Sequence, residues 1–236
     1  MKAKTIIIAL LLYCSAMQAQ PRRINVDSMV DAMNITKASF PEDLADTLLV
    51  PFKTDSEKVR AIFYWMTQHI RYDMKEFHFG PGISPGKDPD TYEYRLATRT
   101  LRLHRGICGD YSLLFAYLCN YAHISCTMVT GFALVERPFF LHMLLYNQLE
   151  NHAWNAVCIN GNYHLVDVTW ACGEGKEGNR PVNETYYLTP PDVFILDHHP
   201  VDTKWELLNK PLRMWAFMDN AKHPGKQAAQ TLAVNK

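Results

Sequence analysis

Apolar residues recur every three or four positions in the first half of the chain, which is the spacing of helices with one buried face. The clearest example runs over residues 54–70, and Thr54 and Glu57 have the spacing of a capping box at its start. Scattered apolar positions in residues 24–50 predict one or two short helices before it. Residues 91–103 resume the helical pattern after it.

A second strong helical pattern follows Cys108. Its apolar stripe is formed by Leu113, Leu114, Tyr117, Leu118 and Tyr121. Gly106 lets the backbone turn sharply into this helix, so Cys108 is expected in its first turn. Upstream, glycine and proline in residues 79–90 predict a loop, which is either a wall of a site or an inert surface excursion.

From Ser125 onward the apolar pattern changes to a period of two, which is typical of strands. Residues 125–134 predict one strand. Two alternating runs on either side of Asn160-Gly161 predict a hairpin with a two-residue turn. An apolar run at 138–150 fits neither pattern. Helices followed by paired strands indicate an α+β domain.

The register of this hairpin determines which side chains share a face. A two-residue turn sets Ile159 opposite Asn162, and counting outward sets His152 opposite Thr169. One face then carries four candidate side chains: His152, Trp154, Asp167 and Thr169. His152 and Asp167 are diagonal neighbours on that face, so the carboxylate can hold the imidazole in one tautomer and stabilise its protonated form. A three-residue loop would place Asp167 on the opposite face.

Cys108 has a position that suits a nucleophilic thiol. At a helix N-terminus the dipole and the unpaired N–H groups favour an anion, which lowers the pKa of a thiol. With His152 as base and Asp167 as orienting carboxylate, the three residues supply the parts of thiol acyl transfer. Taken singly, each has an ordinary structural interpretation, as a small hydrophobe, a core histidine and a strand-end carboxylate.

The composition is that of one globular domain with no excess of either charge. The 236 residues are 48% hydrophobic and 20% charged, with a formal net charge of +0, so neither nucleic acid nor an anionic membrane surface is indicated as a partner. Two lysines, a short apolar stretch and small residues at Ala16 and Ala19 predict a signal peptide over residues 1–19. The protein is then exported to the periplasm or the exterior, without stable membrane insertion. A lipid anchor on Cys14 is the alternative.

Export makes the cysteine count informative. Of the six cysteines, removal of Cys14 leaves Cys108, Cys119, Cys126, Cys158 and Cys172. An odd number leaves at least one thiol unpaired in an oxidising compartment. Their spacings contain no CxxC pair, which argues against a structural zinc site. A disulfide between Cys108 and another of these cysteines would silence its chemistry.

Three segments resemble the transglutaminase-like superfamily: RGICGDYSLLFAYLCNYAHISCTMVTG, NHAWNAVCINGNYHLVDVTW and YYLTPPDVFILDHHPVDTKWELL. They are similar in particular to secreted bacterial relatives of the kyphoscoliosis peptidase. The resemblance implies a papain-like α+β fold, with the cysteine helix packed on an antiparallel sheet. It places the nucleophile at Cys108, the general base at His152 and the orienting acid at Asp167. Two departures are His123, where relatives often have glycine, and the insertion at 138–150.

The resemblance also divides the chain. We expect a signal peptide at 1–19, an N-terminal helical extension at 20–54, the transglutaminase-like domain at 55–210 and a C-terminal tail at 211–236, poorly ordered from about Ala221.

The last matched segment contains residues that are expected to be structural. Pro200 and Trp205 should close the domain by packing. His198 and His199 are adjacent, but two ligands alone are too few for a metal site, so we expect them to have structural roles.

The reaction that these residues support begins with attack of the Cys108 thiolate on an amide carbonyl, which gives a thioester. The Cys108 N–H would hold the oxyanion with a second donor, for which the candidates are Trp65, Gln68 and Tyr72. Trp154 is a further substrate-positioning candidate. Water resolving the thioester gives a peptidase or amidase, and a lysine amine gives a transglutaminase. Hydrolysis is favoured because no acceptor site for an amine is recognisable.

The expected substrate is a protein or peptide, for example a cell-wall peptide, and no cofactor is expected. No acidic cluster of the calcium-binding kind stands out, so no metal requirement is expected either. Two alternatives stay open. One is a non-catalytic module that retains the fold and binds a protein or cell-wall peptide, and the other is a true protein-glutamine transglutaminase.

Overall fold

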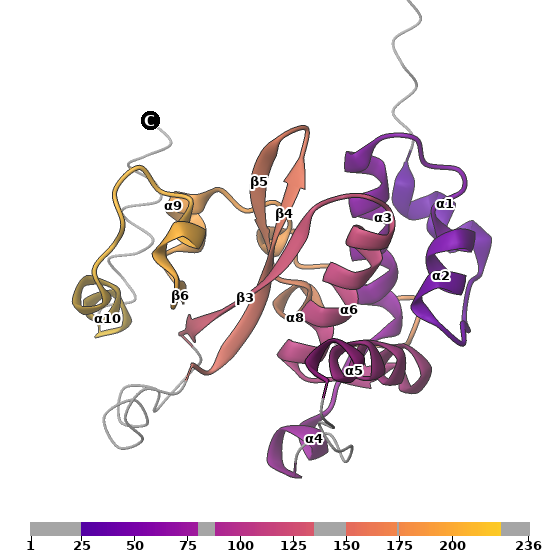
Figure 1. The fold of residues 1–236 in the computed structure, drawn as a ribbon, viewed down its shortest axis with the longest axis horizontal. Coiled ribbons are helices and arrows are strands. Elements are labelled where there is room, and N and C mark those ends of the chain that lie inside the picture. The colour runs from indigo at the N-terminus through magenta and orange to yellow at the C-terminus, as the bar shows by residue number, and fades with distance from the viewer. Residues whose placement is uncertain (1–24, 80–87, 135–149, 174, 223–236) are drawn as a thin grey trace, which may run out of the picture.

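The computed structural model of the chain describes residues 25–79, 88–134, 150–173 and 175–222. Helices gather on one side of a central antiparallel sheet, and the C-terminal elements lie on its other side (Figure 1). This arrangement confirms the predicted α+β class. The predicted signal peptide lies outside the described residues, and so does the apolar run at 138–150 except for Glu150. No helix in the described ranges is long and apolar enough to cross a membrane.

The N-terminal half is helical, as its periodicity predicts. Its helices are α1 (Val26–Met33), α2 (Pro41–Leu48), α3 (Asp55–His69), α4 (Met74–Phe79), α5 (Pro89–Leu103) and α6 (Cys108–Tyr121). The capping box of α3 is confirmed, because the Glu57 N–H donates to Thr54 Oγ1 at 3.3 Å and the Thr54 N–H donates to Glu57 Oε2 at 3.0 Å. α1 and α2 contribute buried residues to the same core as α3 and α6.

Both ends of the predicted loop at 79–90 are helical, and residues 80–87 lie outside the described ranges. Phe79 still belongs to α4, which was not predicted, and α5 begins at Pro89 rather than at residue 91. Proline suits the first turn of a helix, because the missing N–H would have no partner there. Asp88 caps α5 by accepting from the Asp90 N–H at 3.2 Å.

α6 begins at Cys108, as predicted, but its buried surface is wider than the predicted stripe. Tyr111, Phe115 and Cys119 are buried, whereas Tyr121 is 40% exposed. The reason is that α6 packs against α2, α3 and α5 as well as against the sheet, so more than one face is covered. Gly106 has no positive φ. It is needed because a Cβ there would lie 2.6 Å from the Cβ of Asp110.

The sheet has the order β5-β4-β3-β6, with every pair antiparallel. Its strands are β3 (Cys126–Ala133), β4 (His152–Ile159), β5 (Asn162–Val166) and β6 (His198–Pro200). The predicted turn is confirmed, because Asn160 and Gly161 have φ values of 51° and 81° and Ile159 pairs with Asn162. Apolar residues fill both faces of β4: Val157 and Ile159 belong to one core cluster, while Trp154 and Ala156 belong to the other.

The second hairpin strand ends earlier than the alternating pattern predicts. Pairing stops at Asn155 and Val166, and the chain then forms the short helix α8 (Val168–Ala171). The predicted pairing of His152 with Thr169 is therefore wrong. Thr169 lies in α8 because Asp167 accepts from the N–H groups of the first helical turn, which starts a helix where the sequence pattern continues as a strand.

A small parallel pair lies outside the main sheet. β1 (Arg71–Tyr72) follows α3 and pairs with β2 (Arg105–Gly106), which precedes α6. Strands of two residues carry no periodicity, so the sequence could not predict them. This pair brings Tyr72 beside the backbone that leads into Cys108.

The described C-terminal residues carry short helices beside β6. It contains η1 (Glu184–Tyr186), α9 (Pro191–Phe194), η2 (Thr203–Glu206) and α10 (Met214–Lys222). Pro200 is buried, and the rings of Trp205 and Tyr163 are in contact at a centroid distance of 5.2 Å. α10 lies within the expected tail, and its Phe217 is buried against the His199 ring.

Candidate active site

Cys108 is the first residue of α6, where the backbone N–H groups have no partner within the helix. Asp110 defines this helix start, because its buried carboxylate accepts from the Ile107 N–H at 2.8 Å. Burial raises the pKa of Asp110 to about 6, while the bond from Ile107 acts in the other direction. The thiol of Cys108 is half-buried. It therefore lies at the electropositive end of a helix and is still accessible.

His152 and Asp167 meet as the hairpin register predicts. His152 Nε2 lies 2.7 Å from Asp167 Oδ2, and both side chains are almost completely buried. The other oxygen, Oδ1, accepts from the N–H groups of Thr169 and Trp170 at 2.9 and 3.1 Å. One carboxylate thus caps α8 and orients the imidazole, so its position is fixed from two sides.

Each member of the His152–Asp167 pair stabilises the charged form of the other, which burial alone would destabilise. Burial alone would raise the pKa of Asp167, but His152 and His198 outweigh it and hold that pKa well below its usual range. Burial would likewise lower the pKa of His152, yet Asp167 and then Cys108 raise it to about 10. The ring therefore keeps its proton at neutral pH. Because Nε2 faces Asp167, Nδ1 is the nitrogen available to Cys108, and a protonated Nδ1 stabilises a thiolate there.

A profile described as the Transglutaminase-like superfamily matches residues 42–168, and this range contains all three side chains. The chain belongs to the transglutaminase-like superfamily. Its arrangement of a cysteine helix against an antiparallel sheet is the one that the sequence resemblance implied.

Proteins from several animals are similar over most of this chain. The kyphoscoliosis peptidase of Homo sapiens is 33% identical over 197 residues, which cover 81% of this chain and 28% of that protein. Hillarin of Drosophila melanogaster is 27% identical over 192 residues, covering 74% of this chain and 22% of that protein. The chain thus spans less than a third of the length of these relatives. A crystal structure of a TGase aligns with 67% of this chain and 37% of its own at 17% identity, with a TM-score of 0.39.

The structure adds one residue to the site of this transglutaminase-like chain that sequence reasoning assigned only a structural role. His198 Nε2 lies 3.1 Å from Asp167 Oδ2, the oxygen that also faces His152, and His198 Nδ1 lies 2.6 Å from Asp197 Oδ1. The ring is fully buried and stacks on Phe194 at 4.1 Å. His198 thus shares one Asp167 oxygen with His152.

His199 does not join this cluster. Its Nε2 lies 2.9 Å from the Leu212 carbonyl oxygen and its Nδ1 lies 3.0 Å from the Pro200 carbonyl oxygen. Neighbouring residues of a strand point to opposite faces, so the two histidines of β6 cannot serve one site. The same rule, applied to the sequence, would have shown that only one of them could approach the catalytic face.

We expect His198→Phe to slow alkylation of Cys108 by on the order of tenfold, because phenylalanine keeps the stack on Phe194 but removes the contact with Asp167. The measurement is the labelling rate with iodoacetamide between pH 5 and 9. His199→Phe is the matched control, since it alters the adjacent histidine without touching Asp167, and it should label at the unmodified rate. Equal rates in both variants would show that His198 is only part of the core.

Three of the four predicted positioning residues are buried in the core and cannot contact a substrate. Trp65 donates from Nε1 to the Ile35 carbonyl oxygen at 2.8 Å. Gln68 donates to the Arg180 carbonyl oxygen at 3.0 Å and accepts from the Arg180 N–H at 2.8 Å. Trp154 packs beside His152 with a centroid distance of 6.1 Å, so it is a wall of the imidazole site. The helical face of Trp65 and Gln68 points inward because α3 is buried by α1, α6 and α8.

Tyr72 remains a candidate for the second oxyanion donor. It is 40% exposed on β1 and lies close enough to Cys108 for the two side chains to interact electrostatically. Burial, with Cys108 and Asp110, raises the pKa of Tyr72 to about 12. The phenol therefore keeps its proton and can donate a hydrogen bond.

The thiol of Cys108 does not take part in a disulfide. All five cysteines that the structure describes are free: Cys108, Cys119, Cys126, Cys158 and Cys172. Burial strongly raises the pKa of Cys119, which lies beside Cys126 in the core. Cys119 is therefore inert at neutral pH.

Two groups of three metal-ligating side chains occur among the described residues. One is His152, Asp167 and His198, whose donor atoms already bond to one another within a closed aromatic environment. The other is His69, His104 and Glu177, which lies outside the catalytic cluster.

Proposed function

We propose that this chain is a thiol-dependent enzyme that acts on amide bonds of proteins or peptides. In this proposal Cys108 is the nucleophile, His152 carries the proton and Asp167 orients the imidazole. The observation that carries the proposal is the buried His152–Asp167 contact at 2.7 Å, with the Cys108 thiol as a further partner of the same ring. A histidine that served only to fill the core would not need a carboxylate that is fixed in position by the N–H groups at the start of α8.

The proposed mechanism starts from a Cys108 thiolate beside a protonated His152 ring. The Cys108 thiolate attacks the amide carbonyl, and the oxyanion accepts from the Cys108 N–H at the start of α6 and from the Tyr72 hydroxyl. His152 gives its Nδ1 proton to the departing amine, and a thioester remains. Water then attacks the thioester. The water molecule transfers a proton to His152, and the thioester bond breaks to release the carboxylic acid and the Cys108 thiolate.

We favour water over an amine as the second reactant. Kyphoscoliosis peptidases of Homo sapiens and Mus musculus are similar to 81% and 89% of this chain, and their name as peptidases supports hydrolysis over crosslinking. A panel of peptides incubated with an amine acceptor separates the two. Hydrolysis of a backbone amide gives two shorter products, whereas transfer to a glutamine side chain releases ammonia and gives a peptide whose mass has increased by that of the amine minus that of ammonia.

We also propose that the protein is exported, with residues 1–19 removed. The support is the pattern of two lysines, a short apolar stretch and small residues at Ala16 and Ala19. A substrate outside the cytoplasm, such as a protein or a cell-wall peptide, fits this location.

The test of the catalytic assignment is the rate of Cys108 alkylation as a function of pH, measured by mass spectrometry of the labelled peptide. We expect rapid labelling well below the ordinary pKa of a thiol, and a decrease of about a hundredfold at pH 6 in His152→Ala, because the thiolate loses its cation. Cys158→Ser is the matched control and should leave the rate unchanged. Slow labelling that does not depend on His152 would contradict the proposal and favour a non-catalytic binding module.

A further inference from the structure

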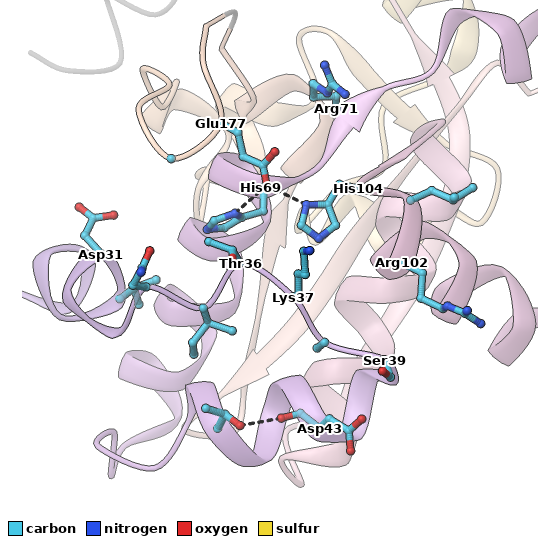
Figure 2. A pocket seen from close by; sticks show the side chains of 17 residues that line it. Asp31, Thr36, Lys37, Ser39, Asp43, His69, Arg71, Arg102, His104 and Glu177 are labelled. Atoms are coloured by element: carbon cyan, nitrogen blue, oxygen red, sulfur yellow. Dashed lines mark hydrogen bonds and ion pairs between the residues drawn. The ribbon is translucent and has the colours of Figure 1, made fainter.

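A second group of functional side chains lies in a groove of about 1250 Å³, away from the cysteine, histidine and aspartate described above (Figure 2). His69 comes from the last turn of α3, His104 ends α5, and Glu177 lies on the segment between α8 and η1. Figure 2 shows the two imidazoles and the carboxylate turned toward one another at the wall of the groove. Three distant parts of the chain therefore bring metal-ligating groups together.

The donor atoms converge on one point. His69 Nδ1 lies 3.2 Å from Glu177 Oε1, and His104 Nδ1 lies 2.7 Å from the same oxygen. All three atoms lie within 4.8 Å of one another. The imidazole side chains are 12% and 17% exposed, so they are largely desolvated, whereas Glu177 is 42% exposed and faces the groove.

Contacts with neighbouring residues hold each of the three residues in place. The His69 ring stacks on Trp65 at a centroid distance of 4.7 Å. His104 has a positive φ of 52°, and its carbonyl oxygen accepts from the Arg71 N–H at 2.9 Å. The segment with Glu177 is fixed to α3 because the Gly178 N–H donates to the Gln68 carbonyl oxygen at 3.1 Å. The donors are thus positioned before any ligand arrives.

The charges of the group also suit a cation. Two neutral imidazoles and one carboxylate bring a single formal negative charge to the group, which suits a cation. Arg71 and Arg102 point away from the group in Figure 2. Lys37 points toward it, and its exposed side chain can turn into solvent when an ion binds.

We propose that His69, His104 and Glu177 bind a divalent transition ion of the zinc class, with water completing its coordination. Two imidazoles and one carboxylate are a ligand set that zinc prefers, and three protein ligands leave one position open. Zinc bonds of about 2.0–2.1 Å place tetrahedral ligand atoms roughly 3.4 Å apart. The His69 contact already has this spacing, and a small rotation of the exposed Glu177 widens the other. On binding, each ring carries its proton on Nε2.

The ion would link α3, α5 and the segment before η1. His104 lies directly before β2 and the start of α6, so the link would steady the backbone that leads to Cys108. The site is independent of the proposed reaction, and no step of that reaction passes through it. It also differs from an acidic calcium-binding cluster, which a sequence pattern could have shown, because its ligands come from segments that are far apart in the sequence.

The test is calorimetric titration of ZnCl₂ into the full chain, prepared without a histidine tag and stripped of metal with a chelator. We expect one ion per chain, and an affinity at least a hundredfold weaker in His69→Ala, in His104→Ala and in Glu177→Gln. Glu177→Gln keeps an acceptor for both imidazoles and so protects the fold. His164→Ala, which removes a histidine of β5, and Cys108→Ser are the controls and should bind as the unmodified chain does.

A second readout is thermal unfolding. Zinc at about 100 times its Kd should raise the unfolding midpoint by on the order of 5 °C in the unmodified chain and not in Glu177→Gln. Binding that weakens only in Cys108→Ser would place the ion at the catalytic cluster and overturn the proposal. Binding that is equal in all variants, or absent at 1 mM zinc, would overturn it as well.

Discussion

Asp167→Asn is expected to reduce alkylation of Cys108 at neutral pH by on the order of a hundredfold, and turnover of a substrate by more. The physical reason lies in the cap of α8. The N–H groups of Thr169 and Trp170 need an acceptor, so the asparagine must direct its carbonyl oxygen to them and its NH₂ group to His152. An NH₂ group facing Nε2 forces the ring proton onto Nδ1. The neutral ring then presents no lone pair to the thiol and no charge to a thiolate.

The same substitution changes the titration of His152. In the unmodified chain burial lowers the pKa of the ring, but Asp167 and Cys108 raise it to about 10, so the ring stays protonated until the pH approaches that value. Without the carboxylate, burial dominates and the ring loses its proton at a lower pH. The titration can be followed by NMR of the labelled imidazole.

Asp197→Asn is the matched control for this prediction. Asp197 lies 2.6 Å from His198 Nδ1 and does not contact His152, so its replacement should change the alkylation rate by less than tenfold. An alkylation rate and an imidazole titration unaltered by Asp167→Asn would contradict the orienting role of this carboxylate.

The sequence predicts the parts of the site that depend on local spacing. Asn160-Gly161 determines the turn, the turn determines the register, and the register brings His152 to Asp167. The start of α6 at Cys108 follows from periodicity in the same way. These predictions hold because each depends on a few neighbouring residues.

The parts that the sequence could not provide depend on contacts between distant segments. Trp65 and Gln68 lie on a helix whose sequence pattern allows both side chains to face a cleft. In the structure α3 is covered by other elements, and both side chains form hydrogen bonds inside the core. His198 reaches Asp167 only because β6 pairs with β3. The end of β5 was also missed, because a carboxylate that caps a helix outweighs the alternation of the following residues. Local patterns carry no information about such competition.

Gly131→Ala is expected to destabilise the protein by about 3 kcal/mol, which is the size of a severe overpacking defect. Gly131 lies on β3 between His152 of β4 and Pro200 of β6. A Cβ there would lie 2.6 Å from Trp154 Cη2 and 2.8 Å from Pro200 Cα, and closer still to the His199 carbonyl oxygen. Two of these atoms belong to backbone, so relief requires β6 to move rather than a side chain to rotate.

The measurement is urea unfolding of Gly131→Ala beside Gly109→Ala. A Cβ on Gly109 meets no atom within 4 Å, and alanine favours the helix, so this control should be neutral or more stable by up to about 1 kcal/mol. Displacement of β6 would also draw His198 away from Asp167, so Gly131→Ala should slow Cys108 alkylation as His198→Phe does. Stability within 1 kcal/mol of the unmodified chain would mean that β6 shifts at little cost. Alkylation at the unmodified rate in the same variant would then show that the position of β6 does not control the thiol.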